Sequence, residues 1–425
     1  MAKQLLQCIE GTRDYLGDAG RRFEAVFAAA AAVFARYDYA KITTPVFEPT
    51  ELFARGIGST TDIVEKEMYT FAPGSDSLTL RPEGTAGVIR AYLQHSLHKQ
   101  GGLQKLWYAG PMFRRERPQK GRQRQFHQVG CEAVGSPDPL LDAEVIALGL
   151  DFFRSVGIAG VRTRLNSIGC PACRPAYREA LKQAVAPLLP QLCKSCQARY
   201  ERNPLRIVDC KACAALTREL PAAYDYLCPE CQAHFAAVKG ALDSLGVAYD
   251  VDKTLVRGLD YYTKTVFEFT HSALGAQDAI GGGGRYDGLV RELGDVDMPA
   301  VGFAIGVERV MMACDALGVH NPERPLDVFG VALGAAAKNA MVGLLAQARA
   351  AGLSADMDFG DRSLKAQMRA ANHKGATVAL ILGDSELSEG KVTVKDLREG
   401  GGQAPAPLGS FLDAVRPLLA GEPGK

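Results

Sequence analysis

The segment that most constrains this chain reads Leu255-Val256-Arg257-Gly258-Leu259-Asp260-Tyr261-Tyr262-Thr263, and one strand's length later comes Gly281-Gly282-Gly283-Gly284-Arg285-Tyr286-Asp287-Gly288. Arginine presents a planar fork of donors to carboxylate or phosphate oxygens. Each tyrosine combines an apolar ring with one hydrogen-bonding tip. Glycines let a ligand approach the backbone closely, although a glycine run in a strand more often marks a bulge or bend. Together, the two pieces indicate a site for a small polar substrate beside a phosphate.

A second polar cluster lies far upstream and contains six basic residues between Arg114 and Arg124, opposed only by Glu116. Strand-like segments on either side predict a hairpin with a basic tip, which suits phosphate. A solvated surface loop is the alternative. Gln128 and Glu132 follow four residues apart, so strand alternation places both on one face of the sheet. That shared face favours a binding site over a loop.

Two further segments join a strand to a helix. The first, Arg81-Pro82-Glu83-Gly84-Thr85, places Glu83 at a helix N-terminus, where it either complements the helix dipole or grips an ammonium group. The second, Gly302-Phe303-Ala304-Ile305-Gly306-Val307-Glu308-Arg309, carries an arginine in the first turn of its helix. This is a common geometry for phosphate binding.

Composition sets broad limits on the function. The chain has 425 residues, of which 47% are hydrophobic and 23% charged, and its formal net charge is +1. These values are typical of a globular protein with more than one domain. The net charge is too small for the protein as a whole to attract nucleic acid. Any contact with nucleic acid must therefore come from local basic patches. The sequence shows no secretory signal and no apolar run of membrane-spanning length, which predicts a cytoplasmic protein without a membrane partner.

Eight of the eleven cysteines form Cys-x-x-Cys pairs, and in a long chain without a signal peptide this pattern indicates metal ligation before disulfides. The pairs are Cys170/Cys173, Cys193/Cys196, Cys210/Cys213 and Cys228/Cys231. Four pairs make two tetrahedral sites for structural Zn²⁺, in a zinc-ribbon-like module. A reduced, metal-free helical insert is the alternative. The sequence leaves open which pairs combine.

Periodicity predicts an α+β chain of three parts. Antiparallel strands alternating with helices form a core over residues 1–169 and 234–321. Residues 170–233 form a cysteine-rich insertion with little strand pattern. After a linker at Pro322–Pro325, residues 326–425 alternate strand and helix as a small doubly wound α/β domain.

These segments resemble the signature motifs of the class II aminoacyl-tRNA synthetases, most closely those of the histidine-specific family. Tyr37–Glu48 resembles motif 1, the dimer-interface segment, Phe113–Glu132 resembles motif 2, and Gly302–Arg309 resembles motif 3. Leu255–Thr263 and Gly282–Gly288 resemble the two motifs peculiar to the histidine enzymes. The segment Arg362–Met368 resembles the family's anticodon-binding domain. The likeness covers nearly all the chain except the cysteine-rich insertion.

The resemblance implies a role for each site residue. Arg114 and Arg309 contact the phosphates of ATP, Glu116 lies near the adenine, and Arg257 sits at the substrate carboxylate and α-phosphate. These three arginines are the expected catalytic groups. The residues expected to bind histidine are Glu83, Gly84, Thr85, Arg114, Gln128, Glu132, Arg257, Tyr261 and Tyr262.

The implied function is ligation of L-histidine to the 3′ end of the histidine tRNA, with ATP and Mg²⁺ as substrate, in a homodimer. Arg199, Arg202, Arg206 and Lys211 of the insertion are candidates for contact with the tRNA acceptor arm. Another class of function is a non-catalytic, histidine-sensing regulatory subunit of ATP phosphoribosyltransferase. Such proteins resemble the catalytic core but typically lose catalytic residues and the C-terminal domain. Other class II specificities, such as prolyl or threonyl, share motif 2 without matching the Arg257–Tyr262 segment.

Overall fold

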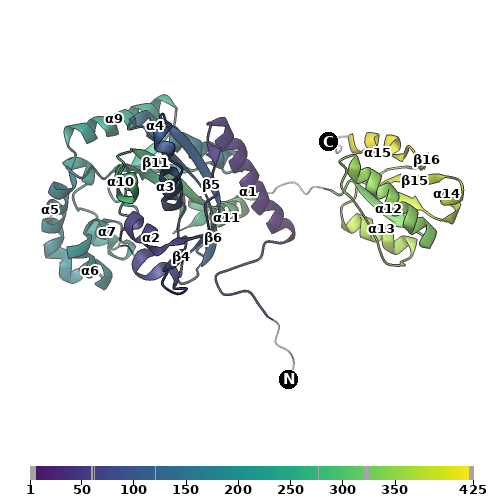
Figure 1. The fold of residues 1–425 in the computed structure, drawn as a ribbon, viewed down its shortest axis with the longest axis horizontal. Coiled ribbons are helices and arrows are strands. Elements are labelled where there is room, and N and C mark those ends of the chain that lie inside the picture. The colour runs from purple at the N-terminus through teal and green to yellow at the C-terminus, as the bar shows by residue number, and fades with distance from the viewer. Residues whose placement is uncertain are drawn as a thin grey trace, which may run out of the picture. The chain divides into compact units, whose positions relative to one another are not determined.

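The computed structural model describes residues 6–58, 61, 63–119, 121–275, 277–319 and 325–420. Lys120 of the basic hairpin and residues 322–324 of the expected linker lie outside this part. The chain forms two compact units, Met1–Asn321 and Pro322–Lys425, drawn in Figure 1.

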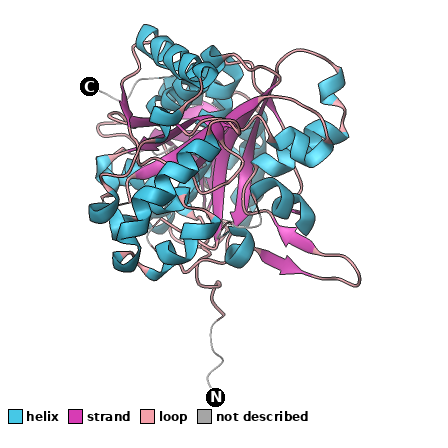
Figure 2. Ribbon diagram, turned by 90° about the vertical axis from the view of Figure 1, so that its left-hand side faces the viewer, coloured by secondary structure: helices cyan, strands magenta, loops and turns pink. Residues whose placement is uncertain are grey.

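The first unit is built on a mixed eight-stranded sheet, shown as the central magenta strands of Figure 2. Its order is β1 (Ala40–Lys41), β5 (Gln104–Phe113), β6 (Gln125–Val134), β11 (Ala300–Gly306), β10 (Ala279–Arg285), β9 (Thr263–Thr270), β7 (Arg162–Ser167) and β8 (Tyr249–Val251). The five inner pairings, from β5 to β7, are antiparallel, which confirms the predicted core. The outermost pairings, β1 with β5 and β7 with β8, are parallel and were not predicted.

Strand alternation gives this sheet one apolar face and one polar face. In β6 the odd positions Val129 and Cys131 are buried in the main core, whereas Gln128 and Glu132 line a cavity. In β9, Phe267 faces the same core while its neighbour Glu268 faces the cavity. The sheet therefore separates the hydrophobic core from the polar site.

Four helices supply the other side of that core: α1 (Gly17–Arg36), α4 (Pro139–Ser155), α9 (Pro229–Ser244) and α11 (Val307–Leu317). A three-stranded sheet of β2 (Phe47–Pro49), β4 (Leu78–Leu80) and β3 (Tyr69–Phe71) forms a second layer. The associated helices are α2 (Thr50–Ile57), α3 (Thr85–Gln94) and α10 (Leu289–Gly294). β2 overlaps the end of the segment Tyr37–Glu48, which resembles motif 1, and lies at one edge of the smaller sheet.

The cysteine-rich insertion is helical. Its α-helices are α5 (Arg174–Val185), α6 (Lys194–Arg202), α7 (Leu205–Val208) and α8 (Ala214–Thr217), joined by short 3₁₀ turns. The described residues between β7 and β8 contain no strand, so the expected zinc-ribbon-like module is wrong. The expected boundary at residues 233 and 234 falls inside α9, whose Cys231 and Phe235 both belong to the main core. The insertion also has a separate hydrophobic cluster that includes Leu181, Cys196 and Cys213.

The second unit is a five-stranded sheet in the order β13 (Ala355–Met357), β12 (Val328–Ala332), β14 (Val378–Leu382), β15 (Lys391–Asp396) and β16 (Gln403–Pro407). The first three strands are parallel, as the alternation of strands and helices predicts. The last two are antiparallel and were missed. The helices are α12 (Ala335–Ala350), α13 (Leu364–His373), α14 (Asp384–Ser388) and α15 (Phe411–Ala420).

Candidate active site

The polar side of the large sheet borders one large cavity of about 1080 Å³. Segments from distant parts of the sequence meet in its walls. They contribute Glu83, Thr85, Arg114, Glu116, Gln128, Glu132, Arg257, Tyr261, Tyr262 and Arg309. All the residues expected to bind histidine or ATP line this cavity except Gly84, whose place is described below.

Arg257 comes from the loop that precedes β9. Its Nη1 donates to Glu268 Oε2 at 2.7 Å, and within the described residues nothing accepts from its buried Nε. A Cβ on Gly282 would lie 2.9 Å from the Arg257 guanidinium carbon, so this glycine leaves room for the side chain. The guanidinium is therefore oriented by Glu268 and has donors left for a ligand.

Glu132 is a fully buried carboxyl group on β6. Thr85 Oγ1 donates to its Oε1 at 2.6 Å, and the Tyr286 hydroxyl donates to Oε2. Burial, opposed by these hydrogen bonds, raises the pKa of Glu132 to about 8. The group can therefore change protonation state near neutral pH.

Three tyrosines gather beside this carboxyl group. The rings of Tyr261 and Tyr262 lie 4.7 Å apart between centroids, and the Tyr286 ring lies 5.5 Å from Tyr261. Burial raises the pKa of all three hydroxyls, so the phenols stay protonated. They form a wall of apolar rings with polar tips, which suits a flat heterocycle that carries hydrogen-bonding nitrogens.

Glu83 occupies the N-terminus of α3. Its carboxylate accepts from the backbone N–H of Thr85 at 2.8 Å and from that of Ala86 at 2.9 Å. Gly84 does not line the cavity. A Cβ there would lie 2.2 Å from the Tyr108 ring, so Gly84 lets Tyr108 pack beneath the helix start. Glu83 thus orders the helix and still faces the cavity.

Arg114 reaches the cavity from the end of β5, and Arg309 reaches it from the first turn of α11. Arg114 Nε donates to the Pro82 carbonyl at 3.0 Å, and its guanidinium lies over the Phe126 ring at 5.3 Å. Arg309 donates to the carbonyl oxygens of Gln277 and Ala279, and burial lowers its pKa. Both cations are held by neutral acceptors, so their charge is available to an anion.

The remaining expected residues lie between these groups. Glu116 forms an ion pair with Arg122 at 3.3 Å across the base of the hairpin tip. The side-chain oxygen of Gln128 is buried, and within the described residues no group donates to it. It therefore offers an acceptor to a bound donor.

Four residues that shape the site were not predicted from the sequence. They are Tyr108, Glu268, Tyr286 and Glu308. Glu308 accepts from the His127 backbone N–H at 2.9 Å and from the Tyr15 hydroxyl at 2.8 Å. The position of Glu268 could have been predicted from the sequence. It stands between Phe267 and Phe269 in a strand, so its carboxylate must face away from the core.

The cysteines form two separate clusters, and in each the sulfur atoms lie within 4.8 Å of one another. We call Cys170, Cys173, Cys228 and Cys231 the inner cluster, and Cys193, Cys196, Cys210 and Cys213 the outer cluster. Pairs of sulfurs lie 3.5 to 4.0 Å apart. Either cluster could hold a metal ion, and the geometry selects one of the three combinations that the sequence left open.

Comparison with known proteins gives one consistent result. The family model for histidyl-tRNA synthetase matches residues 11–310, and that for an anticodon-binding domain matches residues 327–418. The histidine–tRNA ligase of Moorella thermoacetica is 52% identical over 412 residues, which cover 96% of this chain and 97% of the relative.

Solved structures agree with this result. Apo histidyl-tRNA synthetase from S. aureus superposes with a TM-score of 0.82 at 35% identity, covering 97% of this chain and all of that one. A protein from Bacillus halodurans described as an ATP phosphoribosyltransferase regulatory subunit/histidyl-tRNA synthetase shares the fold, with a TM-score of 0.64 at 20% identity over 90% of this chain and 99% of that one. The sequence, the cavity and these matches agree: the chain belongs to the histidyl-tRNA synthetase family.

Proposed function

We propose that this protein is a histidine–tRNA ligase that activates L-histidine with ATP and transfers it to the 3′ end of the histidine tRNA. The observation that carries the proposal is the convergence of Arg114, Arg257 and Arg309 on one cavity that also contains the buried Glu132 and the tyrosine wall. Cations for a nucleotide and polar groups for a heterocycle lie side by side there. Family membership supports the same reading.

In the first step, a carboxylate oxygen of histidine attacks the α-phosphorus of ATP, and pyrophosphate leaves as histidyl-adenylate forms. Two anions must approach each other, so fixed positive charge around the phosphorus is the main requirement. Arg257 would bridge the carboxylate and α-phosphate, and Arg114 and Arg309 would hold the phosphates. ATP enters as its Mg²⁺ complex, with Glu116 near the adenine.

Histidine would lie along the polar face of β6. Glu83 and Gln128 would accept from its α-ammonium group, with Thr85 beside them, and Glu132 and Tyr262 would pair with the imidazole nitrogens while Tyr261 packs nearby. A neutral imidazole has one donor and one acceptor. A site that matches both rejects analogues without them by ~10⁴-fold or more.

In the second step, a hydroxyl of the 3′-terminal ribose attacks the carbonyl carbon, and AMP leaves. Arg199, Arg202, Arg206 and Lys211 line the same cavity from the insertion side, which supports entry of the tRNA acceptor end there. Residues 326–425, which the anticodon-binding model largely matches, would bind the anticodon. Likeness to motif 1 supports a homodimer, and likeness to the family supports a cytoplasmic location. Among the described helices, none is long and apolar enough to span a membrane.

We further propose Zn²⁺ as the ion of the two cysteine clusters, in a structural role. Four thiolates at tetrahedral spacing are a preferred zinc ligand set. The described cysteines form no disulfide.

The test is ATP–pyrophosphate exchange with purified protein and a panel of amino acids. We expect exchange with histidine and none with proline or threonine. The regulatory-subunit alternative predicts histidine binding without exchange. Regulatory subunits typically lack catalytic residues and the C-terminal domain. This chain has three arginines in the cavity and a second unit, and both features support the ligase function.

A further inference from the structure

The insertion holds both ends of the segment 257–264, which carries Arg257 and the two cavity tyrosines. At the first end, Arg206 Nη1 donates to the carbonyl oxygen of Arg257 at 3.1 Å, and Asn203 Nδ2 donates to Asp260 Oδ1 at 2.9 Å. These contacts fix the backbone from which the Arg257 side chain reaches the cavity.

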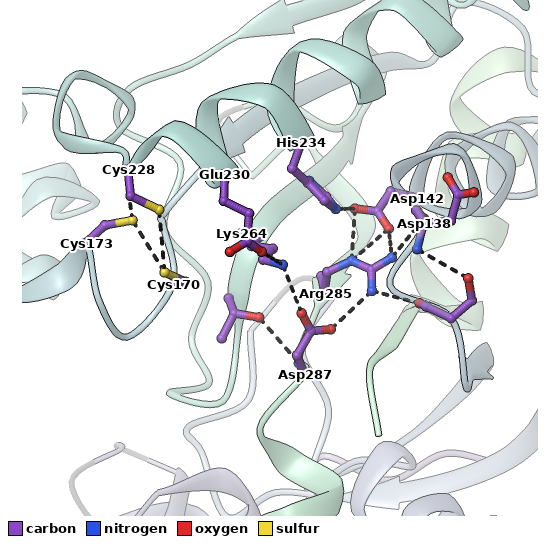
Figure 3. A network of polar contacts seen from close by, with 12 residues as sticks. Asp138, Asp142, Cys170, Cys173, Cys228, Glu230, His234, Lys264, Arg285 and Asp287 are labelled. Atoms are coloured by element: carbon purple, nitrogen blue, oxygen red, sulfur yellow. Dashed lines mark hydrogen bonds and ion pairs between the residues drawn. The ribbon is translucent and has the colours of Figure 1, made fainter. Parts of the chain in front are cut away.

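The second end is held by residues adjacent to the inner cluster. Arg174, directly after Cys173, donates to the carbonyl oxygen of Tyr262. Lys264 Nζ pairs with Glu230 at 3.0 Å, and its backbone N–H donates to the Gly169 carbonyl at 2.9 Å. Figure 3 shows Glu230 and Lys264 beside the inner cysteines. Lys264 has φ of +49°, a strained conformation for a lysine that such contacts maintain.

The contacts at the first end come from the part of the chain that the outer cluster encloses. Asn203 and Arg206 lie on the stretch between Cys196 and Cys210, so a metal at this cluster closes that stretch into a loop. Asn203 follows the end of α6, and Arg206 lies on α7, which has only four residues. A helix this short is not stable alone. Ile207 and Val208 anchor it in the hydrophobic cluster of the insertion, and a metal ion at the outer cluster would fix both ends of the stretch.

The sulfur geometry fits a tetrathiolate ion at both clusters. A tetrahedral Zn²⁺ with bonds of about 2.3 Å places its sulfurs about 3.8 Å apart. Three sulfur pairs lie 3.5, 3.9 and 4.0 Å apart, and within each cluster all sulfurs lie within 4.8 Å of one another. The Cys228 N–H donates to Cys173 Sγ at 3.2 Å, and the Cys193 N–H donates to Cys213 Sγ at 3.3 Å. Amide donors of this kind orient and stabilise ligating thiolates.

The two clusters lie in different hydrophobic cores. Cys173 and Cys231 belong to the main core of the first unit, whereas Cys196 and Cys213 belong to the separate cluster of the insertion. Losing the inner ion would loosen the attachment of the insertion to the core. Losing the outer ion would disturb only the lobe that carries Asn203 and Arg206.

We propose that the two cysteine clusters are tetrathiolate metal sites that clamp the segment 257–264, and that the outer metal ion positions Arg257 for histidine activation. This inference rests on the proposed function. Arg206 and Asn203 are then positioning residues, which act on the reaction through Arg257 and Asp260.

Metal content is the first test. Elemental analysis of protein purified without chelators should find two zinc ions per chain in the wild type and one in the variant Cys196→Ser/Cys213→Ser. Cys8 is exposed and outside both clusters, so Cys8→Ser should retain two and serves as the control. A wild type that exchanges histidine at full rate with no bound metal would overturn the proposal.

Activity is the second test. The outer-cluster variant should lose about 10- to 100-fold in kcat/KM for histidine in pyrophosphate exchange, the loss expected for two hydrogen bonds. Arg206→Met/Asn203→Ala should show a similar loss while retaining both ions, which keeps the test informative if the cysteine variant does not fold. Arg206→Lys, which keeps one donor, should recover part of the activity. The exposed Arg218→Met is the matched control on the same insertion and should be unchanged.

Combining the substitutions tests the mechanism. If the outer ion acts through these two contacts, removing the cysteines in the Arg206→Met/Asn203→Ala background should cause little further loss. Full additivity, or unchanged kinetics in the outer-cluster variant, would refute the positioning role. A wild type without any histidine-dependent exchange would instead contradict the proposed function.

Discussion

Replacing Glu132 with glutamine removes a buried ionisation and should change how stability depends on pH. In the folded protein the pKa of this carboxyl group is raised from 4.5 to about 8, mainly by burial. Between these two values the folded state holds a proton that the unfolded state has released. The free energy of unfolding therefore falls as pH rises through this window, by at most about 1.4 kcal/mol per pH unit.

Raising the pH from 6 to 8 lowers the free energy of unfolding of the wild type by about 2 kcal/mol through this group alone. The change is smaller than the maximal slope would give, because the slope decreases as the pH approaches the folded pKa. Glu132→Gln keeps the shape of the protonated form and does not titrate. The difference in unfolding free energy, variant minus wild type, should thus rise by about 2 kcal/mol over this range.

The assay is urea unfolding at both pH values, followed by fluorescence. Trp107 is the single tryptophan of the chain and is buried in the first unit, so it reports on the unit that contains the site. The exposed Glu24→Gln on α1 is the control and should show no such pH dependence. A stability difference that stays constant from pH 6 to pH 8 would refute the account of Glu132 as a buried, protonated acid.

Three further substitutions test other parts of the site. Arg257→Ala should abolish histidine-dependent pyrophosphate exchange with little change in the urea midpoint, since a polar cavity residue is removed and no core volume; retained exchange would show that its assigned role is wrong. Tyr262→Phe should raise the KM for histidine more than the KM for ATP, and an unchanged histidine KM would count against pairing with the imidazole. Gly84→Ala places a Cβ 2.2 Å from the Tyr108 ring and should cost about 1–3 kcal/mol of stability, whereas Gly288→Ala, which meets no atom within 4 Å, should cost less in the same unfolding assay.

Much of the fold follows from local sequence pattern. The segment Phe126–Val134 alternates apolar and polar residues, and the structure makes it part of β6 with Gln128 and Glu132 on the cavity side. α4 begins where local sequence favours a helix start, because the Asp138 side chain caps it by accepting from the Leu140 N–H and Pro139 is its first residue. Here local propensity and tertiary packing favour the same structure.

Other features depend on contacts that sequence spacing does not encode. The four Cys-x-x-Cys pairs are locally equivalent, and only the folding of the insertion places Cys170 near Cys228 and Cys193 near Cys210. The antiparallel β15 and β16 were missed because a parallel α/β pattern precedes them. Arg257 was recognised as a site residue, but its contact with Glu268 on β9 depends on how the preceding loop lies against that strand.

The same limit explains the basic residues of the insertion. Arg206 was predicted only as a candidate contact for tRNA, yet its guanidinium donates to the backbone of Arg257. Arg202 pairs with Glu65 at 3.2 Å. A charge run in sequence indicates a polar surface, whereas the partner of each charge is set by tertiary structure.

The proposed function depends most on where histidine and the nucleotide bind. A crystal structure of the protein with histidine and a non-hydrolysable ATP analogue measures this directly. We predict that the imidazole lies within hydrogen-bonding distance of Glu132 and Tyr262, with the carboxylate and the α-phosphate both beside Arg257. Histidine bound outside this cavity, or an α-phosphate out of reach of Arg257, would contradict the account.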